Sequence, residues 1–488
     1  MGESNWNELE LALRDSLPEL PPEEIVAEVT PWKRAMGHIL TGLALTSVTL
    51  NVLCLQYLLP AIGTVLMLLG FRALRRENRA FAACSVLSAL RTVFVFALLI
   101  LNATIFPPDG RYAEAETCLT WVQLALQFAL LLCFALALAL VKRKAGTPDA
   151  PNSAWGLLVW YALVCVLALS HYNGMVIGAA MIAVYVCMLR SISALSSQVD
   201  ALGYAIAAAP VRVSEGVLAK ALALLLLTGI ACGYLFGGRY PMRWTPAAEN
   251  EHAAVEAMEE KLLGLGFPKD VLADLSAEEI VTCDGALRVV TQTDDLALND
   301  GRKASETEEG TTYITTVYDD RELRVTGVAV ELPGERWQVF HHFEWTVKPN
   351  CFGTESVQLW PASHLDGWRM IDEPTGRLLC ERGGVTCTAP YYALGTERYT
   401  ASNLLLGERV NTDLFGEFSL PRNGERCRGY VAYTIEKASD IDYILDSWIN
   451  YTHQRSRLQY PVLSAKEHRK TVGWDTYAFI TAQDALQF

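Results

Sequence analysis

The stretch Val217–Gly237, VLAKALALLLLTGIACGYLFG, decides how the rest of this chain is interpreted. It carries one charge, Lys220, and about 20 apolar residues are enough for a helix to cross a bilayer. Similar apolar runs precede it, whereas after Pro241 the apolar residues alternate as they do in strands. The sequence therefore predicts a polytopic α-helical membrane bundle followed by a mainly-β domain.

The apolar runs up to Gly237 predict about seven crossings. They cover residues 35–52, 54–71, 81–106, 118–141, 154–171, 175–190 and 217–237. The first two runs together span about 37 residues, which is short for two crossings of about 20 residues each. One long helix with a re-entrant piece is the alternative, so the predicted count is six or seven.

Basic residues in the short loops predict the orientation of the bundle. Lys and Arg gather before the first run, after the second, after the fourth and before the seventh, and such loops stay in the cytoplasm. The loop 107–117 holds three acids and one base. We therefore expect a multipass protein of the cell membrane with a cytoplasmic N-terminus and an extracytoplasmic C-terminal domain. The acidic first 31 residues do not resemble a cleavable signal peptide.

Net charge divides the chain in the same way. Residues 1–32 carry a formal charge of −7, residues 33–238 carry +7, and residues 239–488 carry −14, which is also the total. We interpret these parts as an acidic cytoplasmic tail, a transmembrane bundle, and a helical neck (239–284) followed by an extracytoplasmic β-rich domain (285–488). The hydrophobic content of 51% excludes a disordered chain, and the lack of a basic face argues against a nucleic-acid partner.

Arg91 is the only charged residue deep inside a predicted crossing. A membrane-buried arginine is costly and can mark a ligand or ion path, yet the other apolar runs hold no Asp or Glu to pair with it. Snorkelling to the headgroups, or a structural hydrogen bond, is the simpler interpretation. Gln123 and Gln127 are candidate partners inside the bundle. We retain Arg91 as a candidate binding residue.

Gly229, Gly233 and Gly237 recur at a spacing of four in the last apolar run. This spacing puts a flat stripe on one helix face, where a neighbouring backbone can approach closely. We expect the stripe to serve packing within the bundle, with homodimerisation as the alternative. The lipid bilayer is the partner that the apolar runs themselves require.

The pattern after the bundle predicts a short helical region and then many strands. Every second residue from Trp337 to Val347 faces the same side of a strand. Further strands are predicted at 311–318, 323–332, 356–360, 377–381, 385–388 and 430–435. Residues 247–283 before them are predicted to be helical, as is Ile441–Ile449 among them. Short strands in succession favour an antiparallel, sandwich-like domain.

Two cysteines of this domain are placed for a disulfide. Cys380 and Cys387 flank Gly383-Gly384, which is a hairpin turn signal. Counting outward from the turn makes them a hydrogen-bonded pair about 5.5 Å apart at Cα, a separation that fits a disulfide. Because disulfides persist outside the cell, we predict one between these residues.

The sequence lacks the patterns that most often mark catalytic and metal sites. The GxxxxGK[ST], HExxH, GxSxG and paired CxxC motifs are absent. His341, His342 and Glu344 cannot all point to one side of a strand, because neighbouring side chains alternate. We therefore name no catalytic residue and expect neither a metal nor a cofactor.

Tryptophans of the outer domain are the better lead to a function. Trp360, Trp368 and Trp474 stand next to turn residues, and aromatic faces bind sugar rings or peptides at little entropic cost. We predict that this domain binds an envelope component or a membrane partner protein, as a sensor, a receptor or an anchored binding module. The alternative is a membrane-bound envelope enzyme or a transport accessory subunit.

Overall fold

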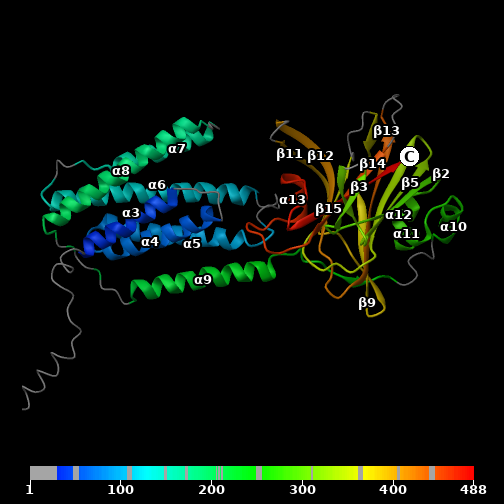
Figure 1. Ribbon diagram of the computed structural model, residues 1–488, viewed down its shortest axis with the longest axis horizontal. Coiled ribbons are helices and arrows are strands. Elements are labelled where there is room, and N and C mark those ends of the chain that lie inside the picture. The colour runs from blue at the N-terminus through cyan, green and yellow to red at the C-terminus, as the bar shows by residue number, and fades with distance from the viewer. Residues whose placement is uncertain are drawn as a thin grey trace, which may run out of the picture. The chain divides into compact units, whose positions relative to one another are not determined.

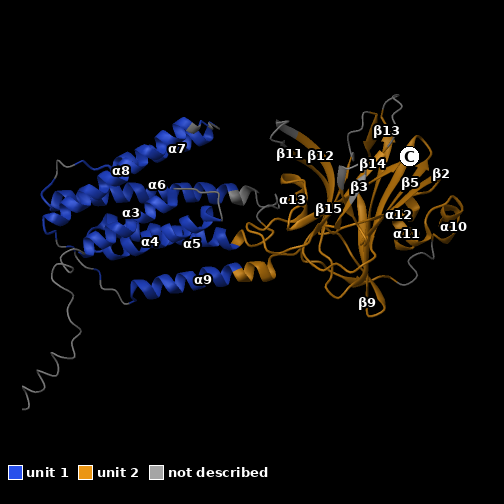
Figure 2. Cartoon of the chain, viewed as in Figure 1, with its two compact units in different colours: residues 1–100, 111–230 blue, residues 101–110, 231–488 orange. Residues whose placement is uncertain are grey.

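The computed structural model consists of two compact units (Figures 1 and 2). Unit 1 comprises residues 1–100 and 111–230, and unit 2 comprises residues 101–110 and 231–488. The structure describes residues 30–47, 54–106, 113–147, 151–170, 174–204, 206, 209, 213–248, 255–308, 311–360, 367–403, 407–438 and 446–488. Nearly all of the predicted acidic tail therefore lies outside the described residues.

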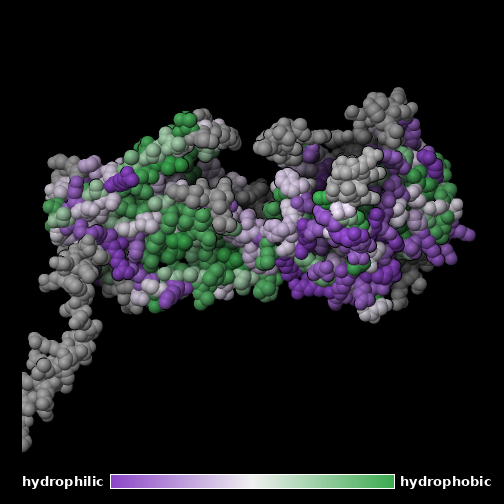
Figure 3. All heavy atoms as spheres, viewed as in Figure 1, coloured by the Kyte–Doolittle hydropathy of each residue, from purple (hydrophilic) through white to green (hydrophobic). Residues whose placement is uncertain are grey.

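Unit 1 is built from helices, and the last of them continues into unit 2. The helices are α3 (Pro31–Ser47), α4 (Leu55–Leu74), α5 (Arg79–Leu101), α6 (Ala113–Lys144), α7 (Ala154–Leu169), α8 (Met175–Ala201) and α9 (Glu215–Phe236). Within the described residues, α4, α5, α6, α8 and α9 contain stretches long and apolar enough to cross a membrane, and α7 is a shorter apolar helix. Figure 3 shows hydrophobic side chains over much of the visible face of this unit. The helices are compatible with a membrane protein.

Helices α3 and α4 pack closely because glycines stand where they meet. A Cβ atom added to Gly42 would lie 2.6 Å from the carbonyl oxygen of Gly63, and one added to Gly63 would lie 2.7 Å from that of Gly42. Gly70 approaches the carbonyl oxygen of Ala35 in the same way, at 2.6 Å. Small residues let helix backbones come together where lipid provides no hydrophobic driving force.

Unit 2 is mostly antiparallel β-structure. Its strands are β1 (Thr245–Pro246), β2 (Arg288–Leu296), β3 (Arg302–Glu308), β4 (Thr311–Val317), β5 (Leu323–Leu332), β6 (Arg336–Trp345), β7 (Glu355–Trp360), β8 (Trp368–Met370), β9 (Thr375–Arg382), β10 (Val385–Ala389), β11 (Ala393–Asn403), β12 (Gly407–Phe418), β13 (Glu425–Lys437), β14 (Asp446–Gln454) and β15 (Phe479–Gln487). An eight-stranded sheet has the order β1-β10-β9-β13-β6-β5-β2, with β8 pairing to β13. A five-stranded sheet has the order β11-β12-β7-β14-β15, and β3 pairs with β4 alone.

One apolar cluster draws side chains from both large sheets. Val339 and Phe343 of β6 join Val357 of β7 and Tyr451 of β14 in it. Residues of β6 on the opposite face, such as Phe340, belong to a second cluster. The alternation of strand side chains therefore buries β6 on both faces. Phe340 is apolar, whereas Gln338 and His342 on the same face are buried polar side chains.

The second cluster contains the short helices that precede the strands. These are α10 (Glu256–Gly264), α11 (Lys269–Asp274) and α12 (Ala277–Thr282). Leu262, Val271 and Ile280 pack with Phe340 and Tyr430 of the eight-stranded sheet. The helices predicted as a neck thus form a layer on this sheet. Helix α12 begins after Ser276, which forms a capping box with Glu279.

One predicted element has the wrong secondary structure. Residues 446–449 of the expected helix Ile441–Ile449 belong to strand β14, and residues 439–445 lie outside the described part of the chain. Trp448 and Ile449 pair with Trp360 and Leu359 of β7. Cross-strand pairing of large side chains outweighs the local helical spacing here. The helix that is present, α13 (Ala465–Thr471), lies further along the chain.

Candidate functional site

The five-stranded sheet carries a polar row on the face opposite its apolar cluster. Val357 and Leu359 of β7 point into the apolar cluster, so Ser356 and Gln358 point to the other side. Gln358 stands opposite Asn450 of β14, and both side chains are buried. A buried polar pair of this kind needs hydrogen-bond partners, and the covering helix supplies one of them.

Helix α13 covers this polar row. Its N-terminus is capped by Ser464, whose hydroxyl oxygen accepts a hydrogen bond from the backbone N–H of Glu467 at 3.2 Å. This start places Arg469 over the sheet, where its Nε donates to Oε1 of Gln358 at 2.7 Å. Burial lowers the pKa of Arg469, and the guanidinium lies near Tyr399 and Asp413.

Five side chains from five elements form one hydrogen-bonded set, which we call the Gln358 network: Gln358, Tyr399, Asp413, Asn450 and Arg469. Oε1 of Gln358 also accepts from Nδ2 of Asn450 at 2.8 Å, and Nε2 of Gln358 donates to Oδ2 of Asp413 at 2.7 Å. The hydroxyl of Tyr399 donates to the same Asp413 oxygen at 2.6 Å. Burial, and next the hydrogen bond to Asp413, raise the pKa of Tyr399, so the phenol stays protonated. The network therefore fixes the amide and guanidinium groups rigidly.

A stacked pair of tryptophans continues the network along the same two strands. Trp360 lies directly opposite Trp448, with ring centroids 5.9 Å apart and ring planes inclined by 16°. Both side chains are half-buried. Nε1 of Trp448 donates to Oδ2 of Asp446 at 2.9 Å, which holds the ring in place. The pair offers a flat aromatic surface two residues from Gln358 and Asn450.

Trp474 lies in the loop after α13, the helix that carries Arg469. Its side chain is 70% exposed, and its carbonyl oxygen accepts a hydrogen bond from Nε2 of His468 at 2.9 Å. Arg469 donates from Nη1 to the carbonyl oxygen of Gly473 at 2.8 Å, so the residue before Trp474 is tied to the Gln358 network. We call Trp360, Trp448 and Trp474 the tryptophan surface.

The structure places Trp368 elsewhere. It lies on β8, where it pairs with Lys437 of β13, and it packs partly buried against the apolar cluster of both sheets. Of the three tryptophans predicted for binding, Trp360 lies two residues from Gln358, and Trp474 follows Gly473, whose carbonyl oxygen Arg469 bonds. Trp368 has neither relation to the Gln358 network. Sequence reasoning missed Trp448 because it placed this residue in a helix.

A charged cluster lies beside the Gln358 network under α13. Nζ of Lys466 bonds Oε1 of Glu417 at 2.6 Å and lies 3.3 Å from Oε2 of Glu397. Burial opposes the charge of Lys466, but Glu417 and Glu397 hold its pKa above the ordinary value. The same helix buries Glu467, whose pKa burial raises. These ion pairs attach α13 to β11 and β12.

Glu355 and His453 form a buried pair on the other face of the five-stranded sheet. Glu355 is fully buried, and its two carboxyl oxygens lie 2.8 and 3.0 Å from Nδ1 of His453. Burial raises the pKa of Glu355, although His453 opposes this shift. The ring of Trp345 packs against His453 at a centroid distance of 4.9 Å. A carboxylate and a histidine in contact could act as a general acid and base. This pair is buried at the apolar cluster, away from solvent.

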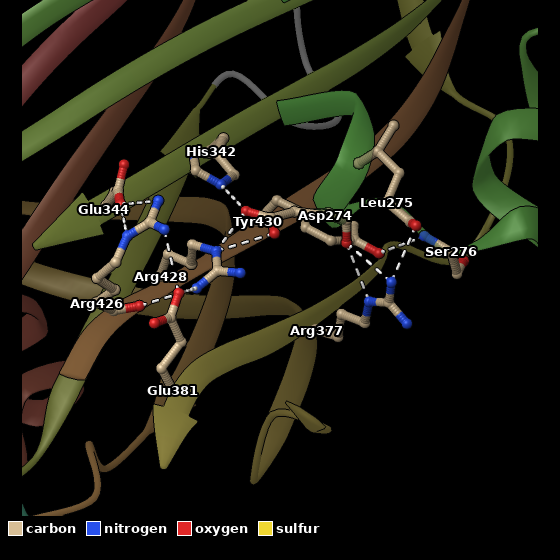
Figure 4. Close-up of polar contacts among 10 residues, drawn as sticks. All are labelled: Asp274, Leu275, Ser276, His342, Glu344, Arg377, Glu381, Arg426, Arg428 and Tyr430. Carbon is tan, nitrogen blue, oxygen red and sulfur yellow. Dashed lines mark hydrogen bonds and ion pairs between the residues drawn. The ribbon is translucent and has the colours of Figure 1, made fainter. Parts of the chain in front are cut away.

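A second buried network attaches the neck helices to the eight-stranded sheet (Figure 4). Asp274 at the end of α11 accepts two hydrogen bonds from Nε of Arg428, at 2.8 and 2.9 Å, and lies 2.9 Å from Nε2 of His342. Arg377 donates to the carbonyl oxygens of Asp274 and Leu275, which caps the helix end. Burial alone would raise the pKa of Asp274, but His342 and Arg428 lower it. This network is satisfied internally, and we assign it a structural role.

The neighbouring histidine faces the opposite side of β6, as the strand pattern predicts. Nε2 of His341 lies 2.7 Å from the hydroxyl oxygen of Ser447, far from the Asp274 network. Glu344 pairs with the exposed Arg426 at 3.2 Å (Figure 4). His341, His342 and Glu344 therefore have three different partners and form no common site.

The hairpin around Gly383-Gly384 has the predicted register, with Cys380 opposite Cys387. Both cysteines are free thiols in the structure, and a disulfide between them stays a prediction. Burial is the main cause that raises the pKa of Cys380, to about 11. Among the described residues, no group of three His, Cys, Asp or Glu side chains is arranged to hold a metal ion.

In unit 1, Arg91 lies inside the helical unit. Its side chain is 8% exposed, and it interacts electrostatically with Tyr161 of α7 and Tyr185 of α8. Its Nε and Nη1 atoms have no hydrogen-bond partner among the described residues, and neither has Oε1 of the buried Gln127. The side chain thus does not reach the surface of the unit, as snorkelling would require.

Two glycines in and just after α9 lie close to side chains at the end of α5 and in the loop that follows it. A Cβ atom on Gly229 would contact the side chain of Ile100, and one on Gly237 would contact Thr104. Gly233 between them is buried. Packing and dimerisation by this stripe both remain predictions.

Comparison of the chain with family models and with curated proteins finds no match. The geometry of the described residues therefore carries the functional argument alone.

Proposed function

We propose that the chain is a membrane-anchored binding protein that holds an envelope component on the tryptophan surface of its β-rich domain. The observation that carries the proposal is the stacked Trp360–Trp448 pair beside the Gln358 network. Flat aromatic rings next to rigid amide and guanidinium groups match ligands that have an apolar face and hydroxyl or amide edges, as sugars and peptides do. Trp474 adds a third, more exposed ring.

The proposed protein has seven membrane crossings and an extracytoplasmic domain in which two sheets form a sandwich. Seven crossings are supported by the seven helices α3 to α9, although α3 and α7 have only 17 and 16 residues. A sandwich of the two sheets is supported by the apolar cluster to which both contribute. The extracytoplasmic position of the domain and the cytoplasmic N-terminus rest on the basic loops. In a sensor, the acidic tail would report occupancy to the cytoplasm.

Binding by the full-length protein in nanodiscs tests the proposal, with isolated envelope polysaccharide as the probe. Trp474→Ala and Trp360→Ala should each weaken binding by roughly 10- to 30-fold, the effect of removing a central aromatic anchor. Tyr318→Ala is the control, because this exposed aromatic residue lies outside the tryptophan surface. Equal binding by all variants would refute the assignment. Release of soluble fragments would favour an enzyme instead.

A transport accessory subunit is the second candidate, and Arg91 favours it. A buried guanidinium with two unpartnered donors, in a helix able to span a membrane, suits an anionic group within the bundle. Arg91→Leu should then abolish function while the protein still inserts and purifies normally. If the Arg91→Leu variant keeps full transport activity, the helices serve only as an anchor.

A further inference from the structure

Unit 2 includes the ends of two membrane-type helices, and hydrogen bonds fix its loops beside them. The hydroxyl of Tyr234, in the last turns of α9, donates to the carbonyl oxygen of Gln459 at 2.6 Å. The backbone N–H of Tyr240 donates to the hydroxyl oxygen of Ser419 at 3.0 Å. The loops around residues 420 and 458 therefore lie where the chain leaves α9, at the level where a spanning helix meets the headgroups.

Three arginines come together at this place: Arg239, Arg422 and Arg457. Arg239 follows α9 directly and donates from Nη2 to the carbonyl oxygen of Leu420, two residues before Arg422. Arg457 lies two residues before Gln459 and donates to the carbonyl oxygen of Phe352. Burial, and then the positive charges of Arg422 and Arg457, lower the pKa of Arg239, as expected of like charges held close together. We call these three residues the basal arginine cluster.

The cluster brings together three arginines that lack ion pairs with described residues. Some arginines elsewhere on the unit are paired, such as Arg302 with Asp319 at 2.6 Å and Arg324 with Asp295 at 2.9 Å. Others, such as Arg336, bond only a backbone carbonyl oxygen of the described residues, but the cluster holds several such charges at one place. Among the described residues, no salt bridge reaches Arg239, Arg422 or Arg457 within 4.0 Å. Nε of Arg239 is buried and lacks a hydrogen-bond acceptor in the same set. A buried donor without a partner is costly, so this group calls for an anion.

Exposed apolar side chains surround the cluster. Phe236, at the end of α9, and Leu458, next to Arg457, are each 81% exposed, and Leu235 is 66% exposed. Large apolar groups in water are unfavourable, whereas the same groups beside arginines suit the boundary between acyl chains and headgroups. The domain as a whole is acidic, with −14 over residues 239–488, so a group of unpaired arginines here is not a consequence of composition.

We propose that Arg239, Arg422 and Arg457 bind the phosphate of an anionic lipid headgroup and so fix the β-rich unit to the membrane surface. Guanidinium groups match phosphate oxygens with paired N–H donors, and the unpartnered Nε of Arg239 supplies one of them. The Leu458 and Phe236 side chains would enter the acyl region beside the bound headgroup. The site is separate from the tryptophan surface and does not depend on the function proposed for it.

The test measures lipid binding to the purified full-length protein in a non-ionic detergent. Phosphatidylglycerol is titrated and compared with phosphatidylcholine, with the bound lipid counted by native mass spectrometry. Arg422→Gln is the first variant, because the exposed Arg422 side chain makes no hydrogen bond with a described residue and its loss should leave the fold intact. Arg422→Gln/Arg457→Gln is the second, and the unfolding temperature of each variant confirms that it is folded.

We expect the affinity for phosphatidylglycerol to fall about fivefold for one arginine and about 25-fold for two, because each basic residue near anionic lipid contributes about 1 kcal/mol. The control is Arg302→Gln/Arg336→Gln, which removes the same charge from exposed positions on other strands and should leave the affinity unchanged. Equal weakening in the control, or no weakening in folded cluster variants, would overturn the proposal.

A third arm distinguishes the source of the phosphate. Inorganic phosphate is titrated without lipid and then as a competitor of phosphatidylglycerol. Weak competition at millimolar concentrations is expected of a lipid site, because the acyl contacts of Leu458 and Phe236 are missing. If inorganic phosphate binds as tightly as the lipid and the cluster variants lose both, the lipid assignment is wrong.

Discussion

His341 illustrates how burial of a single residue links the stability of unit 2 to pH. Its ring is 1% exposed, and its Nδ1 atom has no hydrogen-bond partner among the described residues. Burial lowers the pKa of His341 to about 3, whereas a histidine in the unfolded chain has a pKa of about 6.5. The unfolded state therefore takes up this proton first as the pH falls.

We predict that His341 makes the free energy of unfolding decrease on acidification. The stabilising contribution is complete above about pH 6.5 and is lost by about 1.4 kcal/mol per pH unit as the pH falls towards 3. Denaturant unfolding of the protein, followed by tryptophan fluorescence at several pH values, measures the slope. His341→Asn should reduce the slope by the equivalent of one proton. An identical slope in the two proteins would mean that His341 is protonated in the folded state.

Strand alternation predicts this residue's side of the sheet but not its partners. The period of two correctly places His341 and His342 on opposite faces. Asp274, which bonds His342, is 68 positions away in the chain, and no local pattern connects them. The same holds for the Gln358 network, whose members come from four strands and a helix. Residue-level sites of this kind arise from tertiary pairing, which periodicity does not encode.

At the scale of elements, the α3–α4 pair depends on close backbone approach. The Gly42 position meets both the backbone of Gly63 and the side chain of Met67 at 2.6 Å, so any larger residue forces the helices apart. Gly37 lies on the same helix with nothing within 4 Å of its Cβ position. The two glycines thus provide a matched comparison within one element.

We predict that Gly42→Val destabilises the helical unit by about 1–3 kcal/mol, the usual cost of overpacking. Gly37→Val should have little effect, since its side chain meets open space. Thermal unfolding of both variants in the same detergent provides the measurement. Comparable losses for the two variants would show that helix propensity, rather than packing, determines the result.

The sequence predicted secondary structure correctly where the apolar pattern was long. The prediction failed where the pattern was short. The helices α4, α5, α6, α8 and α9 are long and apolar enough to cross a membrane, and the composition of their segments indicated them. Strand β14 was mistaken for a helix because Trp448 and its neighbours also fit helical spacing. The seven residues of α13 have no apolar stripe, and only the Ser464 to Glu467 cap spacing could have indicated this helix.

At the scale of the whole molecule, the sequence separates a basic helical part from an acidic β-rich part. The two compact units of the structure are likewise helical and mostly β, but residues 101–110 belong to the second unit. Loop charge predicts the orientation of the helices and of the β-rich domain across the membrane, and cysteine labelling can measure it. Trp474 and Lys144 are suitable reporters, because both side chains are exposed and they are predicted to lie on opposite sides.

We predict that Trp474→Cys reacts with a membrane-impermeant maleimide in intact cells, because the basic loops predict that its domain lies outside. Lys144→Cys, in the basic segment at the end of α6, should react only after the membrane is permeabilised. The wild-type chain provides the background from its own cysteines. The reverse pattern of labelling would invert the topology and place the tryptophan surface in the cytoplasm.

The cluster that joins Ile105, Tyr240 and Val462 also bears on how the protein can be divided. The backbone N–H of Ile105 donates to the carbonyl oxygen of Gly237, and that of Val462 donates to the carbonyl oxygen of Asn102. Two segments that are more than a hundred residues apart are thereby built into the base of the β-rich unit. A soluble fragment that begins after residue 240 would lose both, expose Val462 and tend to self-associate. Unit 2 is thus assembled from two separate stretches of the chain, and no single cut in the sequence can release it whole.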